Sequence, residues 1–587
     1  MSYVLVTSQE DLGHVANRID RVDVLGIDLE TTHLRSWLGN IRLMSLRAGD
    51  DRFVIDLFKT GRPDAVLTAL ANQKTIKIAQ NAKFDQSWLL HHYGLELWPL
   101  FDTFRASALI HNGREGMDHD LHTLQKRELN VDPGLDLGGS NWKGELTKDQ
   151  LDYSAIDVEY LPALRDSLRA TLMKLGLAQT AAIEFGAVLP EASIENNGFY
   201  LDPDMWLKLC EKNTVLEREL RAKLALVLPH PKGQLGLPGM DSVGFNFGST
   251  QQLQKSLALL GIHVEGTSKS ELGMILPKIR KQSSRDALVM LMQYKKIRKR
   301  LDSFGPAYLD NIDKVTGRVH ASFYPFTGAG RYSCSAPNLQ QLPREFEYRD
   351  CFRPRGNKLG VWDYSQIELR LAAEISNDPA MISAYAKGQD LHVLTASLLN
   401  DCTLDAVTKV MRQAGKAGNF GLIYGMLAAG LVTYAQTNYG VSMTEAEANE
   451  FRNKFFGGYT GLKRWHRAVF SDSNKRNGYT RTLSGRIRYL DSKLHNEFSN
   501  TPVQGTGADG LKRALRIVYD KLKVHGKKVK MVHHVHDEIA VEAKPDMDML
   551  QQVDVDVKQG MIDGMQVFLK KVPVVVEGHF GDSWGEK

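Results

Sequence analysis

Two apolar runs near the carboxyl end of the chain flank a pair of acids. The run Val529–Val535 precedes Asp537 and Glu538, and Ile539 and Val541 follow them, with β-branched residues at a rough period of two. The pattern predicts a strand, a turn and a second strand, with the acids at the hairpin tip. Aspartate is common in turns, so this pair alone favours a solvated bend over a cation site. A partner carboxylate elsewhere would reverse that preference.

Two strands are predicted near the amino end. Val22–Thr31 is largely apolar, and its acids Asp28 and Glu30 lie two positions apart, hence on the same face of a strand. Ile76–Asp85 predicts another strand, which leads to Asn81 and to a terminal aspartate. Acids at strand ends are common without any chemistry, so each strand alone says little about function.

A helical stretch follows at residues 149–159. It places Tyr153 and Asp157 four positions apart, on one face of the helix. Such a pair is usually a cap or part of a solvated surface. Its order after the two acid-bearing strands makes a shared acidic site the better interpretation.

A candidate partner for Asp537 lies in Lys358–Arg370. An apolar run there predicts a strand that ends near Asp363, and Glu368 follows five residues later at the start of a helical pattern. Asp363 alone could be an ordinary strand-end or capping acid.

Two basic residues followed by two aromatic residues recur at helical spacing in Val410–Gly425 and form one stripe. Arg412, Lys416, Phe420 and Tyr424 recur every fourth residue, and each step turns only about 40° around a helix. An ordinary surface helix with an aromatic end packed inward is one interpretation. The other is a nucleoside triphosphate site, in which the cations neutralise phosphates and the rings meet the sugar and base.

Composition sets the broad class. The 587 residues predict about three or four domains at roughly 150 residues each. The net charge of +5 permits a polyanionic partner. The four cysteines lack CxxC spacing, which predicts a reducing compartment without a disulfide framework or zinc site. No signal peptide or membrane span is expected, and Leu228–Gly239, rich in proline and glycine, predicts a loop.

The first three motifs form a recognisable series. DLE, NAKFD and YSAID resemble the exonuclease motifs of the DnaQ-like proofreading family, which has an RNase H-like α/β fold. The resemblance implies that acids hold two divalent metals across a phosphodiester while a tyrosine orients the attacking water. Carried over, the metal ligands are Asp28, Glu30, Asp85 and Asp157, and the water-positioning residue is Tyr153. The alternative to an active 3′-5′ exonuclease is a decayed scaffold.

The later motifs resemble a second family. DYSQIELR, RQAGKAGNFGLIYG and VHDE resemble motifs A, B and C of the family A DNA polymerases, the bacterial DNA polymerase I type. The segments TGAGRYSCSAPNLQQ, similar to the family's TGRLSS…PNLQN, and NTPVQGTGAD, IENNGFYLD and GDSW extend the similarity over essentially the whole chain. The resemblance implies template-directed addition of dNTPs to a primer 3′ end, with proofreading, in DNA replication.

The resemblance also assigns polymerase residues. Asp363 and Asp537 would bind two Mg²⁺ ions, with Mn²⁺ as a substitute. Glu538 would be an accessory carboxylate, and His536 would contact DNA near the primer terminus.

Nucleotide and DNA contacts follow from the same resemblance. Glu368 matches the steric gate that excludes a ribose 2′-hydroxyl, and Phe420 the position at which phenylalanine accompanies discrimination against dideoxynucleotides. The dNTP site is implied to comprise Arg412, Lys416, Phe420, Tyr424, Glu368 and Gln366. The minor-groove contacts, which test the shape of a base pair without reading its sequence, are implied to be Arg331, Asn500 and Gln504.

The chain has two further clusters of polar residues, a basic cluster whose role stays open and a histidine cluster for which a zinc site is rejected. A helical stretch of the presumed thumb is either a solvated face or a phosphate-tracking surface, and its cations are Lys295, Lys296, Arg298, Lys299 and Arg300. The histidines His533, His534 and His536 are not interpreted as a zinc site, because strand alternation separates the first from the others and no cysteine accompanies them.

The expected architecture is an RNase H-like exonuclease domain followed by a right-hand polymerase with an antiparallel palm sheet. The exonuclease domain is placed at residues 1–180 and the polymerase domain at 181–587. Within the latter we expect the thumb at about 190–320, the palm at about 321–390 and 496–587, and the fingers at about 391–495.

Three positions depart from the family pattern. Asn496 stands where arginine is frequent, Gln341 replaces the usual asparagine, and Ser484 replaces the phenylalanine of TLFGR. These changes bear on template contacts and fidelity, and leave the metal acids intact.

Expectations about origin and partners are less specific. No 5′-nuclease region precedes the exonuclease motifs, and the stretch between residues 194 and 247 is too short for a thioredoxin-binding insertion, which favours a compact phage-type enzyme over a bacterial or organellar one. Partners are primer-template DNA and dNTPs, with a helicase or single-strand-binding protein as further candidates and thioredoxin and membranes not expected. The expected location is cytoplasmic, in the host if the source is a phage. Competing interpretations are an RNase D-like RNA exonuclease with a binding module and a non-catalytic replication scaffold.

Overall fold

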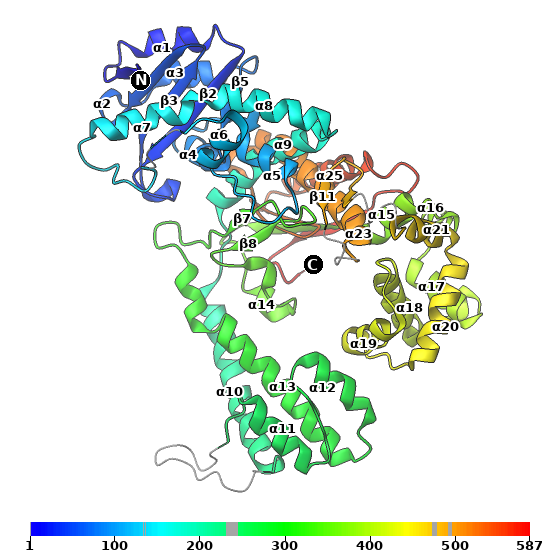
Figure 1. Ribbon diagram of the computed structural model, residues 1–587. Helices are drawn as coiled ribbons and strands as arrows, with labels where there is room; N and C mark the ends of the chain where they lie inside the picture. Colours follow the sequence, from blue (N-terminus) through cyan, green and yellow to red (C-terminus); the bar gives the residue numbers. More distant parts are fainter. Residues whose placement is uncertain are drawn as a thin grey trace.

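The computed structural model describes residues 2–132, 134, 137–229, 245–471, 478–490 and 496–586 (Figure 1). Beyond residue 229, the loop predicted at Leu228–Gly239 lies outside the described residues. No helix among the described residues is both long enough and apolar enough to span a bilayer.

The amino-terminal domain is built on a six-stranded mixed sheet. Its strands lie in the order β1-β4-β3-β2-β5-β6, with β2, β3 and β4 antiparallel and the other neighbours parallel. The strands are β1 (Val4–Val6), β2 (Val24–Thr31), β3 (Ile41–Ala48), β4 (Asp51–Asp56), β5 (Ile76–Ala79) and β6 (Leu100–Asp102). Both faces of β3 are buried, although it carries Arg42, Ser45 and Arg47 among its apolar residues.

Helices cover this sheet, and their apolar faces form its cores. They are α1 (Leu12–Ile19), α2 (Leu57–Thr60), α3 (Asp64–Leu70), α4 (Lys83–Tyr93), α5 (Thr103–Ile110), α6 (Leu121–Leu129), α7 (Lys148–Glu159) and α8 (Leu161–Lys174). Helix α7 begins with a reciprocal capping box between Thr147 and Gln150, and it packs against β2, β3 and β4.

Helix α9 (Ala178–Asn197) joins the two halves of the molecule. It packs against α4 and α5 on one side and against α24 and β12 of the polymerase half on the other. Most of its residues are buried, including the charged Glu184 and Glu191. The predicted domain boundary at residue 180 falls inside this helix, so α9 belongs to the interface of both domains; the boundaries themselves stay a prediction.

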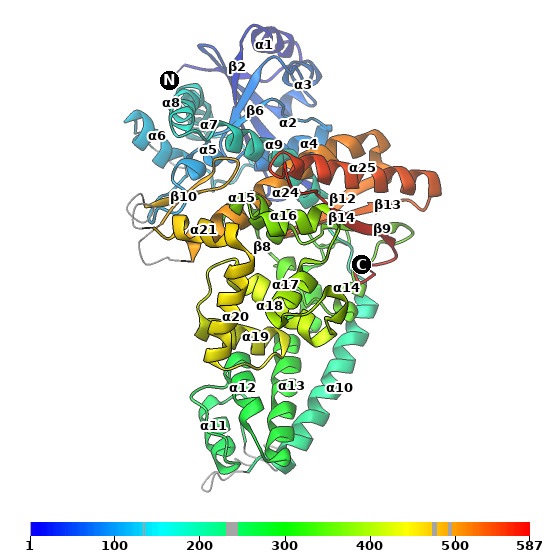
Figure 2. The same ribbon diagram turned by 90° about the vertical axis from the view of Figure 1, so that its right-hand side faces the viewer.

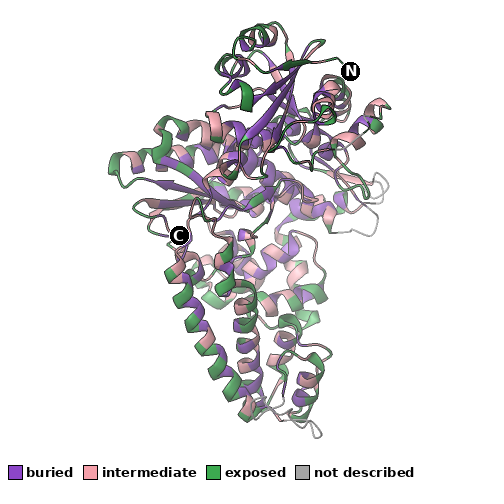
Figure 3. Ribbon diagram, turned by 90° about the vertical axis from the view of Figure 1, so that its left-hand side faces the viewer, coloured by how far each residue is buried: buried purple, intermediate pink, exposed green. Residues whose placement is uncertain are grey.

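The thumb projects from the palm as two long helices with a small helical tip (Figure 2). It comprises α10 (Pro203–Val227), α11 (Thr250–Leu259), α12 (Lys269–Ile275) and α13 (Gln282–Phe304). Its helices share a core of their own, and Figure 3 shows their outer faces exposed, in contrast to the buried sheets above them.

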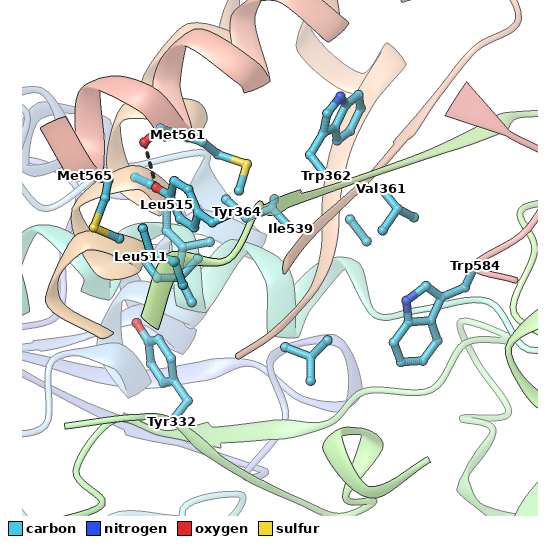
Figure 4. Close-up of a cluster of buried hydrophobic side chains, with 14 of the residues drawn as sticks. Tyr332, Val361, Trp362, Tyr364, Leu511, Leu515, Ile539, Met561, Met565 and Trp584 are labelled. Atoms are coloured by element: carbon cyan, nitrogen blue, oxygen red, sulfur yellow. Dashed lines mark hydrogen bonds between the residues drawn. The ribbon is translucent and has the colours of Figure 1, made fainter. Parts of the chain in front are cut away.

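The palm is a four-stranded antiparallel sheet in the order β12-β13-β9-β14. Its strands are β9 (Lys358–Tyr364), β12 (Val529–Val535), β13 (Glu538–Ala543) and β14 (Val576–Gly581), and its helices are α15 (Ile367–Ser376), α16 (Pro379–Ala386), α24 (Thr506–Leu522) and α25 (Met547–Gln566). The two long helices α24 and α25 pack together. In the palm core, the Tyr364 hydroxyl donates a 2.6 Å hydrogen bond to the Met561 carbonyl (Figure 4).

The fingers are helical and lie beside the palm (Figure 1). They comprise α17 (Leu391–Asn400), α18 (Lys409–Leu422), α19 (Ala428–Tyr439), α20 (Glu445–Gly458) and α21 (Thr460–Val469). Helix α19 lies against α12 of the thumb tip.

Short elements complete the described chain. Two small hairpins pair β7 (Ser322–Tyr324) with β8 (Ser333–Ser335) and β10 (Tyr479–Arg481) with β11 (Ile487–Tyr489), and the short helices are α14 (Phe346–Asp350) and α23 (Glu497–Asn500). The β10–β11 hairpin leaves the helical fingers and docks on the exonuclease domain, where Asn112 hydrogen-bonds the Ile487 carbonyl at 2.7 Å.

Candidate active sites

The first acidic site lies at the edge of the exonuclease sheet. Strand β2 supplies Asp28 and Glu30, and helix α7 supplies Asp157; one carboxylate oxygen from each lies within 4.8 Å of the others. Across the described part of the chain, this is the only such group of three among acidic, histidine and cysteine side chains. Residues separated by more than 120 positions therefore share one site, as their motif order predicts.

Asp85 joins this site from a helix. Strand β5 ends at Ala79, Asn81 takes a left-handed φ of 53°, and α4 begins at Lys83. The strand predicted over Ile76–Asp85 is thus too long, because the turn at Asn81 ends it and places Asp85 in the first turn of α4.

The electrostatics of the site suit a cation. Burial raises the pKa of Asp28 to about 6. Burial and the nearby Asp28 raise the pKa of Asp85 well above its usual range, and Asp85 Oδ1 is buried without a hydrogen-bond partner. Burial, followed by Asp157 and Glu30, raises the pKa of the Tyr153 hydroxyl, which hydrogen-bonds Asp157. Neighbouring carboxylates repel one another when ionised, and a bound divalent cation would offset that repulsion through its bonds to their oxygens. These residues therefore fit such an ion.

The second acidic site lies at one end of the palm sheet. Asp363 of β9 is in register opposite Glu538 of β13, and the amide of Tyr364 donates a 3.3 Å hydrogen bond to the Asp537 carbonyl. The predicted hairpin is confirmed, with His536 and Asp537 between its strands and His536 at a left-handed φ of 54°. The pairing of β9 with β13 therefore brings Asp363 close to the turn that carries Asp537, although 174 positions separate the two acids in the sequence.

Glu538 has partners that the sequence did not reveal. It is buried, and it accepts hydrogen bonds from the indole of Trp584 and from Arg349 at 3.4 Å. Arg349 also lies over the Trp584 ring at 4.2 Å. The terminal GDSW motif contained the signal, since its tryptophan is one of these partners. The role of Glu538 as an accessory carboxylate stays a prediction.

Glu368 lies between two groups in the first turn of α15. Arg331 pairs with one of its oxygens, and the Tyr424 hydroxyl donates to the other. Gln366, at a left-handed φ of 53°, accepts a 3.2 Å hydrogen bond from Tyr385. Arg331 and Tyr424, which the resemblance assigned to primer-template and nucleotide contact, thus both contact the assigned gate residue Glu368.

The predicted stripe is helical over three of its four members. Helix α18 carries Arg412, Lys416 and Phe420 but ends at Leu422, so Tyr424 lies beyond it. Gly425, with a φ of 79°, turns the chain there.

Within the stripe, Arg412 has an acidic partner. Its guanidinium pairs with Asp390 at 2.7 Å, and Asp390 also caps the start of α17. The centre of the Phe420 ring lies 5.7 Å from that of the His392 ring, which belongs to α17. These contacts orient the stripe, and its role in nucleotide binding stays a prediction.

Asn500 and Gln504 lie at a π-helical turn, Thr501–Gly505. Asn500 Oδ1 is buried without a hydrogen-bond partner, and Gln504 hydrogen-bonds Tyr424. Their contacts with DNA stay predictions.

The basic thumb cluster is partly paired within the chain. Glu345 pairs with Lys296 at 3.1 Å and with Arg300, while Arg298 pairs with Asp302 at 3.0 Å. Lys295 donates to the Thr267 carbonyl at 2.6 Å. Both interpretations of this helix stay open.

A cavity of about 810 Å³ lies between the two halves, and none of the four exonuclease acids lines it. The exonuclease domain contributes Asn81, Lys83 and Phe84, and the polymerase domain contributes Phe323 and Tyr324.

The fold and the two acidic sites define a right-hand polymerase joined to an RNase H-like exonuclease domain. Comparison with known proteins agrees: residues 239–586 match the family model for DNA polymerase family A, and residues 3–173 match that for a 3′-5′ exonuclease. The chain belongs to DNA polymerase family A, and it is a DNA polymerase with a 3′-5′ exonuclease domain. Domains of both kinds generally depend on divalent metals.

Relatives extend over the whole chain. DNA polymerase I of Aquifex aeolicus is 30% identical, with 100% of both chains covered. DNA polymerase I of Pseudomonas aeruginosa is 29% identical over 100% of this chain but 66% of its own length. The structure of the POL domain of Pol1 from M. smegmatis in complex with DNA primer-template and dNTP covers 99% of both chains with a TM-score of 0.82 at 23% identity, a likeness in fold. The expectation of a phage-type enzyme stays a prediction.

Proposed function

We propose that this polymerase extends a primer 3′ end at Asp363 and Asp537 and removes mispaired ends at Asp28, Glu30, Asp85 and Asp157, in both cases with Mg²⁺. The observation that carries the proposal is the register of β9 and β13, because it brings to one end of one sheet the two acids that polymerisation requires.

The polymerase acids would hold a pair of divalent ions. When bound, such ions lower the pKa of a primer hydroxyl and neutralise a triphosphate and its leaving pyrophosphate. Asp363 and Asp537 fit this task because the end of β9 and the β12–β13 turn, joined by the hydrogen bond from the Tyr364 amide to the Asp537 carbonyl, hold their backbones side by side. Arg412 and Lys416, one turn apart on α18, would bind the phosphates of the incoming nucleotide.

Selection of the nucleotide would depend on residues around the sugar. Glu368, held by Arg331 and Tyr424, would exclude a 2′-hydroxyl. Phe420 and Tyr424 would meet the sugar and base, and Gln366 lies beside the same helix start. Arg331, Asn500, Gln504 and His536 would contact the primer-template.

Excision would use the exonuclease acids with Tyr153. Its hydroxyl, bonded to Asp157, would orient the water that attacks the terminal phosphodiester. The cavity between the halves is lined by aromatic rings and by Lys83, which pairs with Glu195 at 2.7 Å, and its rings would suit stacking with the bases of an unpaired single strand.

One experiment tests the two activities separately. Purified protein is given a labelled primer-template with Mg²⁺, first without and then with dNTPs. We expect shortening in the first case and extension in the second. Asp363→Asn should abolish extension alone, and Asp28→Asn excision alone. Shortening in both cases would favour the RNase D-like exonuclease interpretation, and no change in either would favour a scaffold.

Replacement of Mg²⁺ by Mn²⁺ should preserve activity, because both ions accept carboxylate oxygens. A role in DNA replication together with a helicase or single-strand-binding protein is part of the same proposal.

A further inference from the structure

A buried charged network crosses the interface between the two catalytic halves. Its cations come from both halves, and its acids lie mainly on α9 and α24; the members are Asp102, Arg105, Glu184, Glu191, Arg486, Asp509 and Lys512. Each of the side chains is at most 2% exposed in these pairs. The network therefore combines three cations with four acids whose side chains are almost fully shielded from the surface.

Glu184 of α9 is the centre of one branch. It pairs with Lys512 at 2.5 Å, with Arg105 at 3.3 Å and with Arg486. Arg486 also pairs with Asp509 at 2.6 Å. This branch joins the exonuclease domain to α24 and to the β10–β11 hairpin.

Glu191 is the centre of a second branch. Its two oxygens receive the guanidinium of Arg105, at 3.0 Å for one of them. The Tyr332 hydroxyl donates to Glu191 at 2.5 Å. The Tyr332 ring also lies 4.4 Å from His534 and 4.9 Å from the Lys512 ammonium, and Figure 4 shows its hydroxyl directed away from Trp584.

One end of the network reaches the exonuclease site. Asp102, 3.5 Å from Arg105, accepts backbone hydrogen bonds from Asn81 and Ala82 at 3.1 Å each. This is the left-handed turn that ends β5 and places Asp85 on α4. The network thus supports the backbone of an exonuclease metal-ligand candidate.

The other end reaches Thr327–Tyr332 of the palm, which we call the primer-terminus segment because the proposed function places Arg331 at the primer-template. Tyr332 directly follows Arg331, which pairs with the proposed gate Glu368. Thr327 donates to the Arg331 carbonyl at 2.8 Å, so this segment is a closed loop anchored on one side by Tyr332.

Stability alone does not account for this network. Buried ion pairs pay a large desolvation penalty, and apolar residues of similar volume are often as stable. The family patterns TGRLSS and TLFGR have an apolar residue at two of these places, where this chain has Tyr332 and Ser484. Ser484 donates to Asp509 at 2.6 Å and Tyr332 donates to Glu191, so both polar side chains add hydrogen bonds to the same network.

We propose that Tyr332 and Arg105, acting through Glu191, are positioning residues that hold the primer-terminus segment and the exonuclease turn in one fixed register, and so favour extension over excision. The inference rests on the proposed function, because it concerns how a primer end divides between the two sites. Loss of the Tyr332 hydroxyl would loosen the Arg331 segment while Asp102 still holds the exonuclease turn. The primer end should then leave the polymerase site more often.

The test uses the full chain with Tyr332→Phe, which removes one hydroxyl and keeps the ring. The control is Tyr308→Phe, because the Tyr308 hydroxyl is also buried but has no hydrogen-bond partner. Single-turnover excision and extension are measured on matched and mismatched primer-templates, and excision on a free single strand. A fluorescent base analogue at the primer end reports its surroundings.

We expect Tyr332→Phe to raise the excision-to-extension ratio on matched ends by at least about threefold, with excision of the free single strand unchanged. Tyr308→Phe should leave every ratio unchanged. A ratio in Tyr332→Phe that is equal to or below that of the unaltered protein would overturn the proposal, as would a proportional fall of all activities. Unaltered protein that neither extends nor excises would instead refute the proposed function, and this inference with it.

Discussion

The Tyr424 hydroxyl donates a hydrogen bond to the carboxylate of Glu368 across 56 residues of sequence. The other oxygen of that carboxylate pairs with Arg331. Burial, followed by Glu368, raises the pKa of Tyr424 well above its usual range, so the hydroxyl stays a donor. One acid therefore joins the segment that follows α18, the start of α15 and the segment that carries Arg331.

Replacement of Glu368 tests its role as a gate. Glu368→Ala removes the side chain that would collide with a 2′-hydroxyl, and we expect ribonucleotide incorporation relative to deoxyribonucleotide to rise at least about tenfold. Single-nucleotide extension with each sugar measures the change. Glu368→Gln is the matched control, since it keeps the volume and should retain most of the selectivity. Unchanged sugar selectivity in the alanine variant would reject the role.

Phe420→Tyr tests discrimination against dideoxynucleotides. A hydroxyl at this position of α18 would offer a hydrogen bond in place of the missing 3′-hydroxyl, and we expect dideoxy incorporation to rise about tenfold or more. Chain-termination assays measure this ratio. Phe456→Tyr, which adds a hydroxyl to another partly buried ring of the fingers, should leave it unchanged. Equal termination by both variants would contradict the assignment of Phe420.

Local pattern predicted most of the elements that carry the proposed catalytic acids. The alternation around Asp537 and the apolar run before Asp363 each identified a strand, because a palm strand must bury its side chains whatever its neighbours are. The helical stretch predicted over residues 149–159, which puts Tyr153 and Asp157 on one face, is likewise confirmed as α7. The predicted end of β5 was wrong, because the left-handed turn at Asn81 that follows the strand depends on Asp102, which is 21 residues away.

The interface network was beyond sequence reasoning. Glu184 and Lys512 are 328 residues apart, and each alone is typical of a solvated helix. Only the packing of α9 against α24 buries them and makes each the partner of the other. The departure at Ser484 was visible in the sequence, but its partner Asp509 was not.

Two buried histidines predict acid sensitivity of the palm. Burial lowers the pKa of His533 to about 3 and that of His534 well below its ordinary value. Between about pH 6.5 and 3 these histidines are therefore protonated in the unfolded chain but neutral in the folded chain. The free energy of unfolding should fall as the pH falls through this window. Thermal unfolding from pH 7 to 4 should show a smaller loss in His533→Phe, which suits its aromatic neighbours Phe199 and Trp584. The exposed His579→Phe is the control, and an equal pH slope in both variants would contradict this account.

Restoration of the family pattern at Ser484 should destabilise this chain. Ser484 is 3% exposed, and its hydroxyl donates to Asp509 and lies 3.0 Å from the hydroxyl of Thr180. Ser484→Phe would force a ring into filled space and remove one hydrogen bond to a buried acid. We expect a cost of about 2–4 kcal/mol.

Denaturant or thermal unfolding measures that cost. Ser270→Phe, at an exposed position of α12, should change stability by no more than about 0.5 kcal/mol. Ser484→Ala separates the two causes, because it removes the hydrogen bond without adding volume and should cost about 1–3 kcal/mol. A phenylalanine variant as stable as the unaltered protein would mean that the surrounding side chains repack to the arrangement of the family pattern, and that Asp509 does not depend on this serine.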